Sequence, residues 1–194
     1  MIYQLIGLFL FIFGLSHKLE TTRSLDFQAV RLIQNRLGSL PFLAWFEELW
    51  VFGRTTFTLV ILLLLTGYNW KLGLSALSVF GMVAGLELVI KSTFNRSRPY
   101  SVHKDIQMLQ PREPTDPSFP SGDTLRIWFL ILILVIALGN NLAFGILSVL
   151  LAVLVTLGRL VFGVHYLTDV LAGIGLGFLG AGTTIWLWQS LHLL

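Results

Sequence analysis

The chain has 194 residues, of which 55% are hydrophobic and only 12% are charged. Its mean hydropathy of +0.81 is far above that of soluble globular domains, so the composition predicts an integral membrane protein. The net charge is +3, and the absence of cysteine excludes a disulfide framework, thiolate chemistry and cysteine-ligated metals. We expect residues 1–194 to form one domain.

Apolar runs divide the chain into predicted spans, because a helix needs about 20 apolar residues to cross the hydrocarbon. The run at residues 1–15 resembles the apolar part of a signal peptide. It lacks a basic start and a small-residue cleavage site, so we interpret it as part of the structure. Further spans are predicted at residues 52–66, with an extension back to Leu40, and at residues 71–90, 127–138, 142–162 and 170–191.

An amphipathic helix is predicted in the stretch SLDFQAVRLIQNRLGSL, which lies between the first two runs. Its apolar residues recur at near-helical spacing against basic and amide residues, as in helices that lie in the membrane interface; they are Leu25, Val30, Ile33 and Leu37. The predicted fold is therefore an all-α bundle of about six transmembrane helices, with this interfacial helix near the N-terminus.

The polar segments are predicted to gather at one membrane face. Short turns at residues 67–69 and 139–141 fall on one side, so alternation places residues 16–39, 91–126 and 163–168 together on the other. The positive-inside rule favours a cytoplasmic position for this second face. Cations retained for binding would distort that count, so the orientation stays open.

The first polar motif, KSTFNRSRP, places two cations at the exit of a predicted span. Lys91 and Arg98 could clamp a phosphate there, and Pro99 ends any helix. Alternatively, Lys91 snorkels to the interface, while Arg96 and Arg98 are ordinary loop charges. Glu87, one helical turn before Lys91, could be its ion-pair partner, and we assign it no role.

The second motif, SFPSGDTLR, places Ser121 and Gly122 at the start of a predicted helix. Unpaired amides and the helix dipole favour an anion at such a position, and glycine permits close approach to the backbone. The alternative is an ordinary helix cap, for which Asp123 is well suited. A carboxylate in an anion site calls for an explanation.

The third motif, GRLVFGVHYLTD, combines Arg159 at the end of a span with His165 and Asp169. The spacing of four residues lets Asp169 accept an imidazole N–H, which leaves the other ring nitrogen as a nucleophile. The alternative is an interfacial histidine, with Asp169 or Thr168 as a helix cap.

Together, the three motifs resemble the signature K-x6-R-P, P-S-G-H and S-R-x5-H-x3-D of the type-2 phosphatidic acid phosphatase superfamily, over residues 91–169. The resemblance implies a membrane phosphatase that acts on lipid phosphates or diphosphates without a metal or other cofactor. It implies that His165 forms a phosphohistidine and that Asp169 orients it. It further implies phosphate binding by Lys91, Arg98, Ser121, Gly122 and Arg159.

Two positions depart from this signature. Gly158 replaces the serine before Arg159, and Asp123 replaces the histidine expected to protonate the leaving oxygen. In water an Asp has a pKa near about 3.9, and Arg126 one turn further on favours its ionised form. Either Asp123 is protonated beside bound phosphate and acts as the catalytic acid, or the leaving group needs little protonation. His103 could replace the acid, although a lone loop histidine is more often simply solvated.

The missing acid favours isoprenyl or polyprenyl diphosphates as substrates. A phosphate monoester leaves with far less protonation than an alkoxide, and acid assistance is worth about 10²–10⁴-fold where it is needed. Alternatives are a phosphatidate- or phosphatidylglycerophosphate-type monoester phosphatase, and a weakly active or noncatalytic family member that binds lipid phosphates. A transporter or channel is disfavoured because the charges cluster at span ends. Membrane lipids are expected partners, and nucleic acid is not.

Three further patterns support predictions about the surroundings of the site. The loop at residues 100–119 is either a lid that selects headgroups or a plain connector. Small residues in the last span are predicted to permit close helix packing, and could equally serve a homodimer; they are Gly173, Gly177, Gly180 and Gly182. Tryptophans are predicted to mark headgroup levels; they are Trp45, Trp50, Trp70, Trp186 and Trp188.

Overall fold

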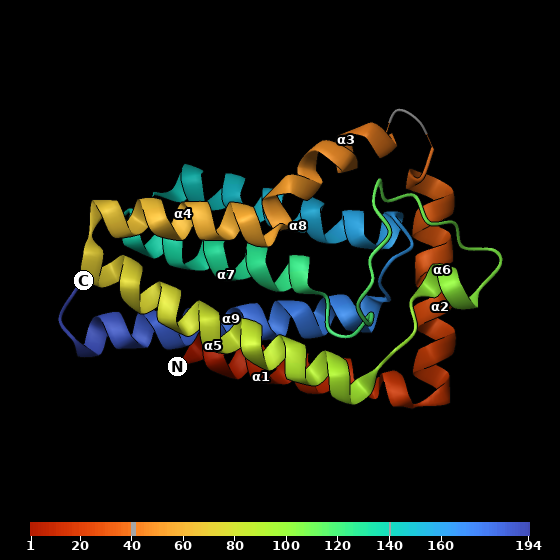
Figure 1. Ribbon diagram of the computed structural model, residues 1–194, viewed down its shortest axis with the longest axis horizontal. Helices are drawn as coiled ribbons and strands as arrows, with labels where there is room; N and C mark the ends of the chain where they lie inside the picture. Colours follow the sequence, from red (N-terminus) through yellow and green to blue (C-terminus); the bar gives the residue numbers. More distant parts are fainter. Residues whose placement is uncertain (40–41, 140) are drawn as a thin grey trace.

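The computed structural model describes residues 1–39, 42–139 and 141–194, and in these ranges all regular structure is helical. Figure 1 shows the long helices side by side along the longest axis. They are α1 (Ile2–Gly14), α4 (Thr55–Tyr68), α5 (Trp70–Phe94), α7 (Gly122–Ala137), α8 (Leu142–Val161) and α9 (Leu167–Ser190). Across one end lies α2 (Glu20–Leu37), and α3 (Phe42–Leu49) runs obliquely near the same end (Figure 1). The short helix α6 (Pro99–Val102) also lies there.

The helices confirm the predicted all-α membrane architecture, but the span count is less simple. Within the described ranges, three helical segments are long and apolar enough to cross a membrane singly, namely Trp70–Val102, α8 and α9. The number rises to five if two helix pairs, bent by 101° and 49°, each form one span. With 16 residues, or about 24 Å, α7 is short for a span. The count of six spans therefore stays a prediction.

The predicted interfacial helix corresponds to α2, which turns by 101° from the preceding segment. Its buried face differs from the prediction. Asp26, Val30 and Gln34 are buried at spacings of four residues, whereas Leu25 is 63% exposed. The two polar residues are buried because they have hydrogen-bond partners: Gln34 Nε2 donates to the carbonyl oxygens of Gln107 at 2.7 Å and Val161 at 3.0 Å. The predicted extension of the next span back to Leu40 corresponds to α3 and the 3₁₀ turn Trp50–Gly53, which are bent by 49° from α4. Leu40 itself lies outside the described residues, as does Asn140 in the predicted turn.

Glycines let α9 pack closely against two neighbours. A Cβ atom at Gly177 would lie 2.7 Å from the Leu125 carbonyl oxygen of α7, and one at Gly175 would lie 2.6 Å from the Phe11 amide nitrogen of α1. Both distances are shorter than van der Waals contact, so only glycine fits without a shift. The small residues of α9 thus serve packing within this chain. Since α1 and α7 both pack on α9, this helix is central to the bundle.

Not every tryptophan marks a headgroup level as predicted. Trp45, Trp70 and Trp186 are exposed, but Trp188 is fully buried and its Nε1 donates to Ser75 Oγ at 2.7 Å. Burial of an indole requires such a partner for its N–H. Trp50 lies in the wall of a polar cavity, described below.

Several helix ends that carry the three motifs meet at the end covered by α2 (Figure 1). There α5 ends at Phe94 and is capped by Asn95, whose φ of 42° is left-handed, and α7 begins directly after Ser121. At the start of α9, Asp169 Oδ2 accepts the Tyr166 amide at 2.8 Å in a capping-box arrangement. These ends, with the 103–121 connection, surround the candidate site.

Candidate active site

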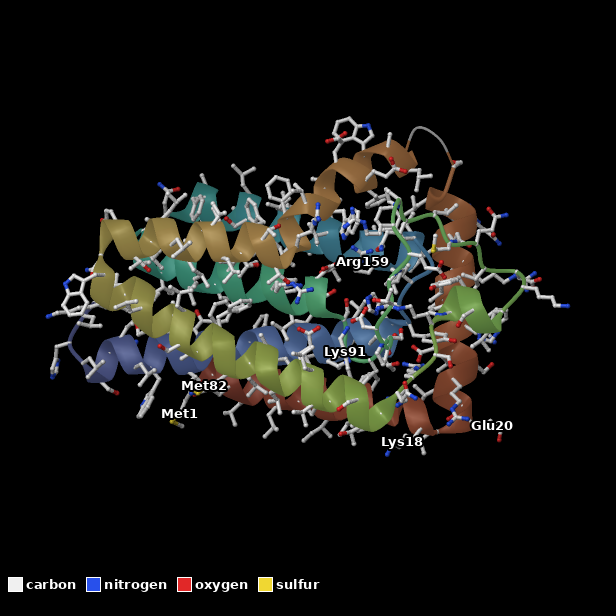
Figure 2. All side chains as sticks on the ribbon, viewed as in Figure 1. Met1, Lys18, Glu20, Met82, Lys91 and Arg159 are labelled. Atoms are coloured by element: carbon white, nitrogen blue, oxygen red, sulfur yellow. The ribbon has the colours of Figure 1, made fainter. Side chains whose placement is uncertain are left out.

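A cavity of about 410 Å³ opens between these helix ends. Its walls include residues of all three motifs and of the connecting loop, namely Trp50, Arg54, Lys91, Arg98, Gln110, Arg112, Asp116, Gly122, Asp123, Arg126 and His165. In Figure 2, Lys91 and Arg159 both lie in the half of the bundle nearer α2. Arg159, Ser121 and Asp169 are at most 1% exposed. The structure thus brings the predicted site residues together in two groups. Those of the first group line the cavity, and those of the second are buried and are called the buried layer; the first group is Lys91, Arg98, Gly122, Asp123 and His165, and the second is Arg159, Ser121 and Asp169.

The turn between α8 and α9 holds His165 in a defined orientation. Its Nδ1 lies 2.8 Å from the Ser118 carbonyl oxygen. A carbonyl can only accept, so in the neutral ring Nδ1 carries the proton and Nε2 keeps its lone pair. Nε2 lies 3.3 Å from Nη1 of Arg98, which donates to it. Burial first, and then the charge of Arg98, lower the pKa of His165 to about 4, so the ring is neutral at neutral pH.

Asp169 does not make the direct hydrogen bond to His165 that its spacing predicts. Its Oδ2 lies 3.7 Å from Nδ1, because the Ser118 carbonyl oxygen takes the N–H instead. Asp169 accepts from the Ser118 hydroxyl and the Tyr166 amide. It therefore orients His165 largely through Ser118, a residue to which the sequence analysis assigned no role.

Arg96 is not the ordinary loop charge considered as an alternative. Its Nη1 donates to Asp169 at 2.5 Å and to Thr168 Oγ1 at 2.8 Å, and its Nη2 donates to Asp26 at 2.8 Å. The guanidinium carbon lies 4.0 Å from the centre of the Tyr166 ring, which adds a cation–π contact. Asp26 also accepts the Thr168 amide at 3.0 Å. Arg96 and Asp26 thus tie α2 to the start of α9, a pairing for which the sequence carries no local signal.

The two cations of the first motif share one carboxylate from the loop. Asp116 Oδ2 accepts from Lys91 Nζ, and Asp116 Oδ1 lies 2.9 Å from Arg98 Nη2. Glu87, the suggested partner of Lys91, lies 3.4 Å away from its Nζ. Burial acts to raise the pKa of Asp116, but Lys91 and Arg98 outweigh it and lower the pKa, which keeps the carboxylate ionised. No local sequence signal distinguishes Asp116, which is one of several polar residues in a proline-rich loop.

Asp123, which stands where the family signature has histidine, is held between two guanidiniums. Its Oδ2 accepts from Arg159 at 2.6 Å and from Trp50 Nε1 at 3.1 Å, and its Oδ1 accepts from Arg126 at 2.9 Å. Such surroundings favour the ionised carboxylate. Asp123 therefore has the partners of a positioning group for Arg159 and Arg126, and among the described residues its hydrogen-bond partners all favour the ionised form.

Gly122 and Ser121 occupy different surroundings at the start of α7. A Cβ at Gly122 would overlap Glu87 Oε1 and would lie 2.7 Å from Arg126 Nη2, so glycine makes room for this ion pair at the cavity wall. The Ser121 hydroxyl instead pairs with Thr124 Oγ1 at 3.0 Å, and its amide donates to the Asp169 carbonyl oxygen at 3.0 Å. In this conformation the Ser121 side chain faces its own helix, and a donation to phosphate would need another rotamer.

A family model described as the PAP2 superfamily matches residues 70–192, which include all three motifs. The chain belongs to the PAP2 superfamily. One curated relative, an undecaprenyl-diphosphatase from Sulfolobus acidocaldarius, is 33% identical over 116 residues, 60% of this chain. The match spans 55% of that relative, about half of its length.

Two solved structures extend the PAP2 likeness to the fold of most of the chain. A transmembrane PAP2 type phosphatidylglycerolphosphate phosphatase from Bacillus subtilis has a TM-score of 0.83 at 24% identity, with 98% of both chains covered. Aquifex aeolicus LpxE has a TM-score of 0.74 at 24% identity, with 84% of this chain and 95% of that chain covered. The first likeness therefore includes α1 to α4, which precede the residues of the family match.

Proposed function

We propose that this protein hydrolyses lipid diphosphates of the isoprenyl or polyprenyl class, through a phosphohistidine formed on His165. The observation that carries the proposal is the unprotonated Nε2 of His165 beside Arg98, in a cavity whose wall also holds Lys91, Arg112 and Arg126. Phosphoryl transfer requires mainly a positioned nucleophile and fixed positive charge around the transferring group. The neutral Nε2 of His165 and the cations in this cavity wall support the proposal.

The proposed reaction has two steps. Nε2 of His165 attacks the terminal phosphorus, the bond from that phosphorus to the bridging oxygen breaks, and the lipid monophosphate leaves with the electron pair. Water then attacks the phosphorus, the P–N bond breaks with its electron pair returning to Nε2, and inorganic phosphate leaves with the oxygen and protons of the water. Lys91, Arg98 and the Gly122 amide would hold the phosphoryl oxygens, and Arg159 and Ser121 would support them from the buried layer.

The surroundings of Asp123 support a diphosphate substrate. A carboxylate that accepts from Arg159, Arg126 and Trp50 is a poor proton donor, so a substrate that needs little acid assistance fits this site best. A diphosphate expels a phosphate monoester, which is stable as an anion, whereas a phosphatidate must expel an alkoxide. The undecaprenyl-diphosphatase relative supports the same choice of substrate.

Additional cations in the cavity wall also support a substrate that carries a second phosphate group. Besides Lys91 and Arg98 near the nucleophile, the wall contains Arg54, Arg112 and Arg126. A monoester presents one phosphate, which the first two cations can hold. Arg126 already pairs with Asp123 and Glu87, so Arg54 and Arg112 are the cations that could hold the phosphate that stays on the lipid.

Phosphate release from matched lipids tests the substrate class. The purified protein in detergent should show a higher kcat/KM on a prenyl diphosphate than on phosphatidate or phosphatidylglycerophosphate. Acid assistance sets the scale, so the ratio is expected to reach at least about 100-fold. A higher kcat/KM on phosphatidate than on any prenyl diphosphate would overturn the choice.

Trapping of the intermediate tests the mechanism. After a rapid alkaline quench, substrate labelled with ³²P in its terminal phosphate should leave an acid-labile label on the wild-type protein. The label should be absent from His165→Ala, whose turnover should fall by at least about 10³-fold. Binding of the lipid by a wild-type protein that neither acquires label nor releases phosphate would instead indicate a noncatalytic binding protein.

A further inference from the structure

The carboxylate of Asp116 occupies the binding groups that the proposed reaction needs. Its two oxygens contact two different cations, Lys91 through Oδ2 and Arg98 through Oδ1. The same guanidinium that holds Asp116 through Nη2 reaches Nε2 of His165 through Nη1 at 3.3 Å. The carboxylate and Nε2 of His165 therefore contact the two Nη atoms of one guanidinium, and Asp116 takes cation contacts that a phosphoryl group at His165 would use.

Access to these cations depends on Asp116. The Lys91 and Arg98 side chains are only 6% and 7% exposed, whereas the Asp116 side chain is 48% exposed. An entering phosphate therefore meets the carboxylate first, and a negative charge next to a phosphate is repulsive. Binding requires that the Asp116 side chain leaves at least one of its two cations.

The backbone around Asp116 is anchored, so a side-chain rotation is the smallest movement that frees the cations. The Asp116 carbonyl oxygen accepts from Arg98 Nε at 2.9 Å, and the Ser118 amide donates to the Arg96 carbonyl oxygen at 2.8 Å. The side chain itself lines the cavity and is half exposed to solvent. Rotation about its Cα–Cβ bond would leave these backbone contacts intact.

We propose that Asp116 is an internal competitor for the phosphoryl site, which the substrate displaces and which selects for highly charged headgroups. This inference rests on the proposed phosphatase function of the same cavity. A negatively charged competitor on these cations lowers the affinity of every anion that must displace it. A diphosphate carries more charge than a monoester and has further cations to contact, so it displaces the Asp116 carboxylate more easily. Asp116 thus adds a second selection for diphosphates, independent of the missing acid.

Inorganic phosphate tests this inference without any turnover. Calorimetry in detergent should show that Asp116→Asn binds phosphate about 10-fold more tightly than the wild type, the size expected for a half-exposed ion pair. Asp105→Asn is the matched control. It removes a carboxylate from the same loop, whose side chain is 58% exposed and lies 3.6 Å from Arg31, and should leave the phosphate affinity unchanged.

The opposite result would identify Asp116 as a positioning residue for Lys91 and Arg98. In that case Asp116→Asn would bind phosphate more weakly than the wild type, and the inference would be wrong. An unchanged affinity would also overturn it. With lipids, Asp116→Asn should raise kcat/KM on a monoester by a larger factor than on a prenyl diphosphate.

The two proposals fail in different experiments. If the wild type hydrolyses prenyl diphosphates but Asp116→Asn does not tighten phosphate binding, the competitor is wrong and the function stands. If phosphate binding tightens but no lipid diphosphate is hydrolysed, the competitor stands and the proposed function is wrong.

Discussion

At the scale of single residues, the site shows how an imidazole is kept neutral without a carboxylate at hydrogen-bond distance. Nδ1 of His165 donates to the Ser118 carbonyl oxygen, and Asp169 holds the hydroxyl of the same serine. A peptide carbonyl fixes the tautomer as well as a carboxylate does, but it adds no negative charge that would favour protonation. The adjacent Arg98 disfavours protonation further. At neutral pH the Nε2 of His165 therefore carries no proton.

The low pKa of His165 can be measured directly. In an NMR titration, the imidazole signal that disappears in His165→Asn should have a midpoint near pH 4. Because the native pKa lies below the unfolded value of 6.5, the unfolded chain binds more protons between these two values. The stabilising contribution is therefore complete above about pH 6.5 and is lost as the pH falls toward 4. The melting temperature of the wild type should fall more over this range than that of His165→Asn; an equal fall would contradict the prediction.

Asp123 is predicted to matter for stability as well as for chemistry. Asp123→Asn would remove the carboxylate that pairs with Arg159, which is 1% exposed, whereas Arg126 keeps a second carboxylate, Glu87, at 3.2 Å. Removal of one partner from a buried ion pair costs about 3–5 kcal/mol, because the other charge stays buried. Thermal unfolding in detergent should show a clear loss of stability. Asp105→Asn, at an exposed pair, should change stability by less than about 1 kcal/mol; equal effects of the two substitutions would contradict this account.

At the scale of helices, α9 forms the frame on which the site depends. Its N-terminus carries Asp169, while its glycines contact α7, whose first turn carries Gly122 and Asp123. Close packing of these two helices therefore sets the distance between the second and third motifs. Because a peptide carbonyl cannot move out of a helix, a side chain added at this contact must separate the helices.

Gly177→Ala tests this contact. The new methyl group would lie 2.7 Å from the Leu125 carbonyl oxygen, so we expect a loss of about 1–3 kcal/mol of stability, as for an overpacked core. Gly81→Ala on α5 is the matched control, because its Cβ would have no described neighbour within 4 Å. That substitution should be neutral or slightly stabilising, since alanine is the better helix former. Similar melting temperatures for the two variants would show that the α7–α9 contact tolerates a side chain.

At the scale of the whole molecule, the polar chemistry lies at one end of the bundle and short turns lie at the other. In Figure 1, α2 and the 103–121 connection lie at one end, and the turn between α4 and α5 lies at the opposite end. Residues of this connection, among them Gln110 and Asp116, line the cavity. For a protein in a bilayer, this arrangement predicts that the two ends face different compartments.

Cysteine labelling can test this sidedness, because the chain has no cysteine of its own. Tyr68→Cys marks the α4–α5 turn and Lys104→Cys marks the site end; both side chains are exposed. In sealed vesicles with uniform orientation, an external membrane-impermeant maleimide should label only one of the two variants. After detergent is added, both should react. Labelling of both before detergent would contradict the arrangement, and the identity of the labelled variant would give the orientation of the site.

The sequence by itself determined the membrane setting, the helical class and the grouping of three motifs, because hydropathy and motif spacing are local properties of the chain. Lys91, Gly122 and His165 could be selected in this way. Tertiary structure decided which charges meet. Asp116 on Lys91 and Arg98, and Asp26 on Arg96, join residues at separations of 18 to 70 positions, where no periodicity carries a signal. Folding brings such groups together because a buried charge requires a partner, and that requirement is satisfied in space and not along the chain.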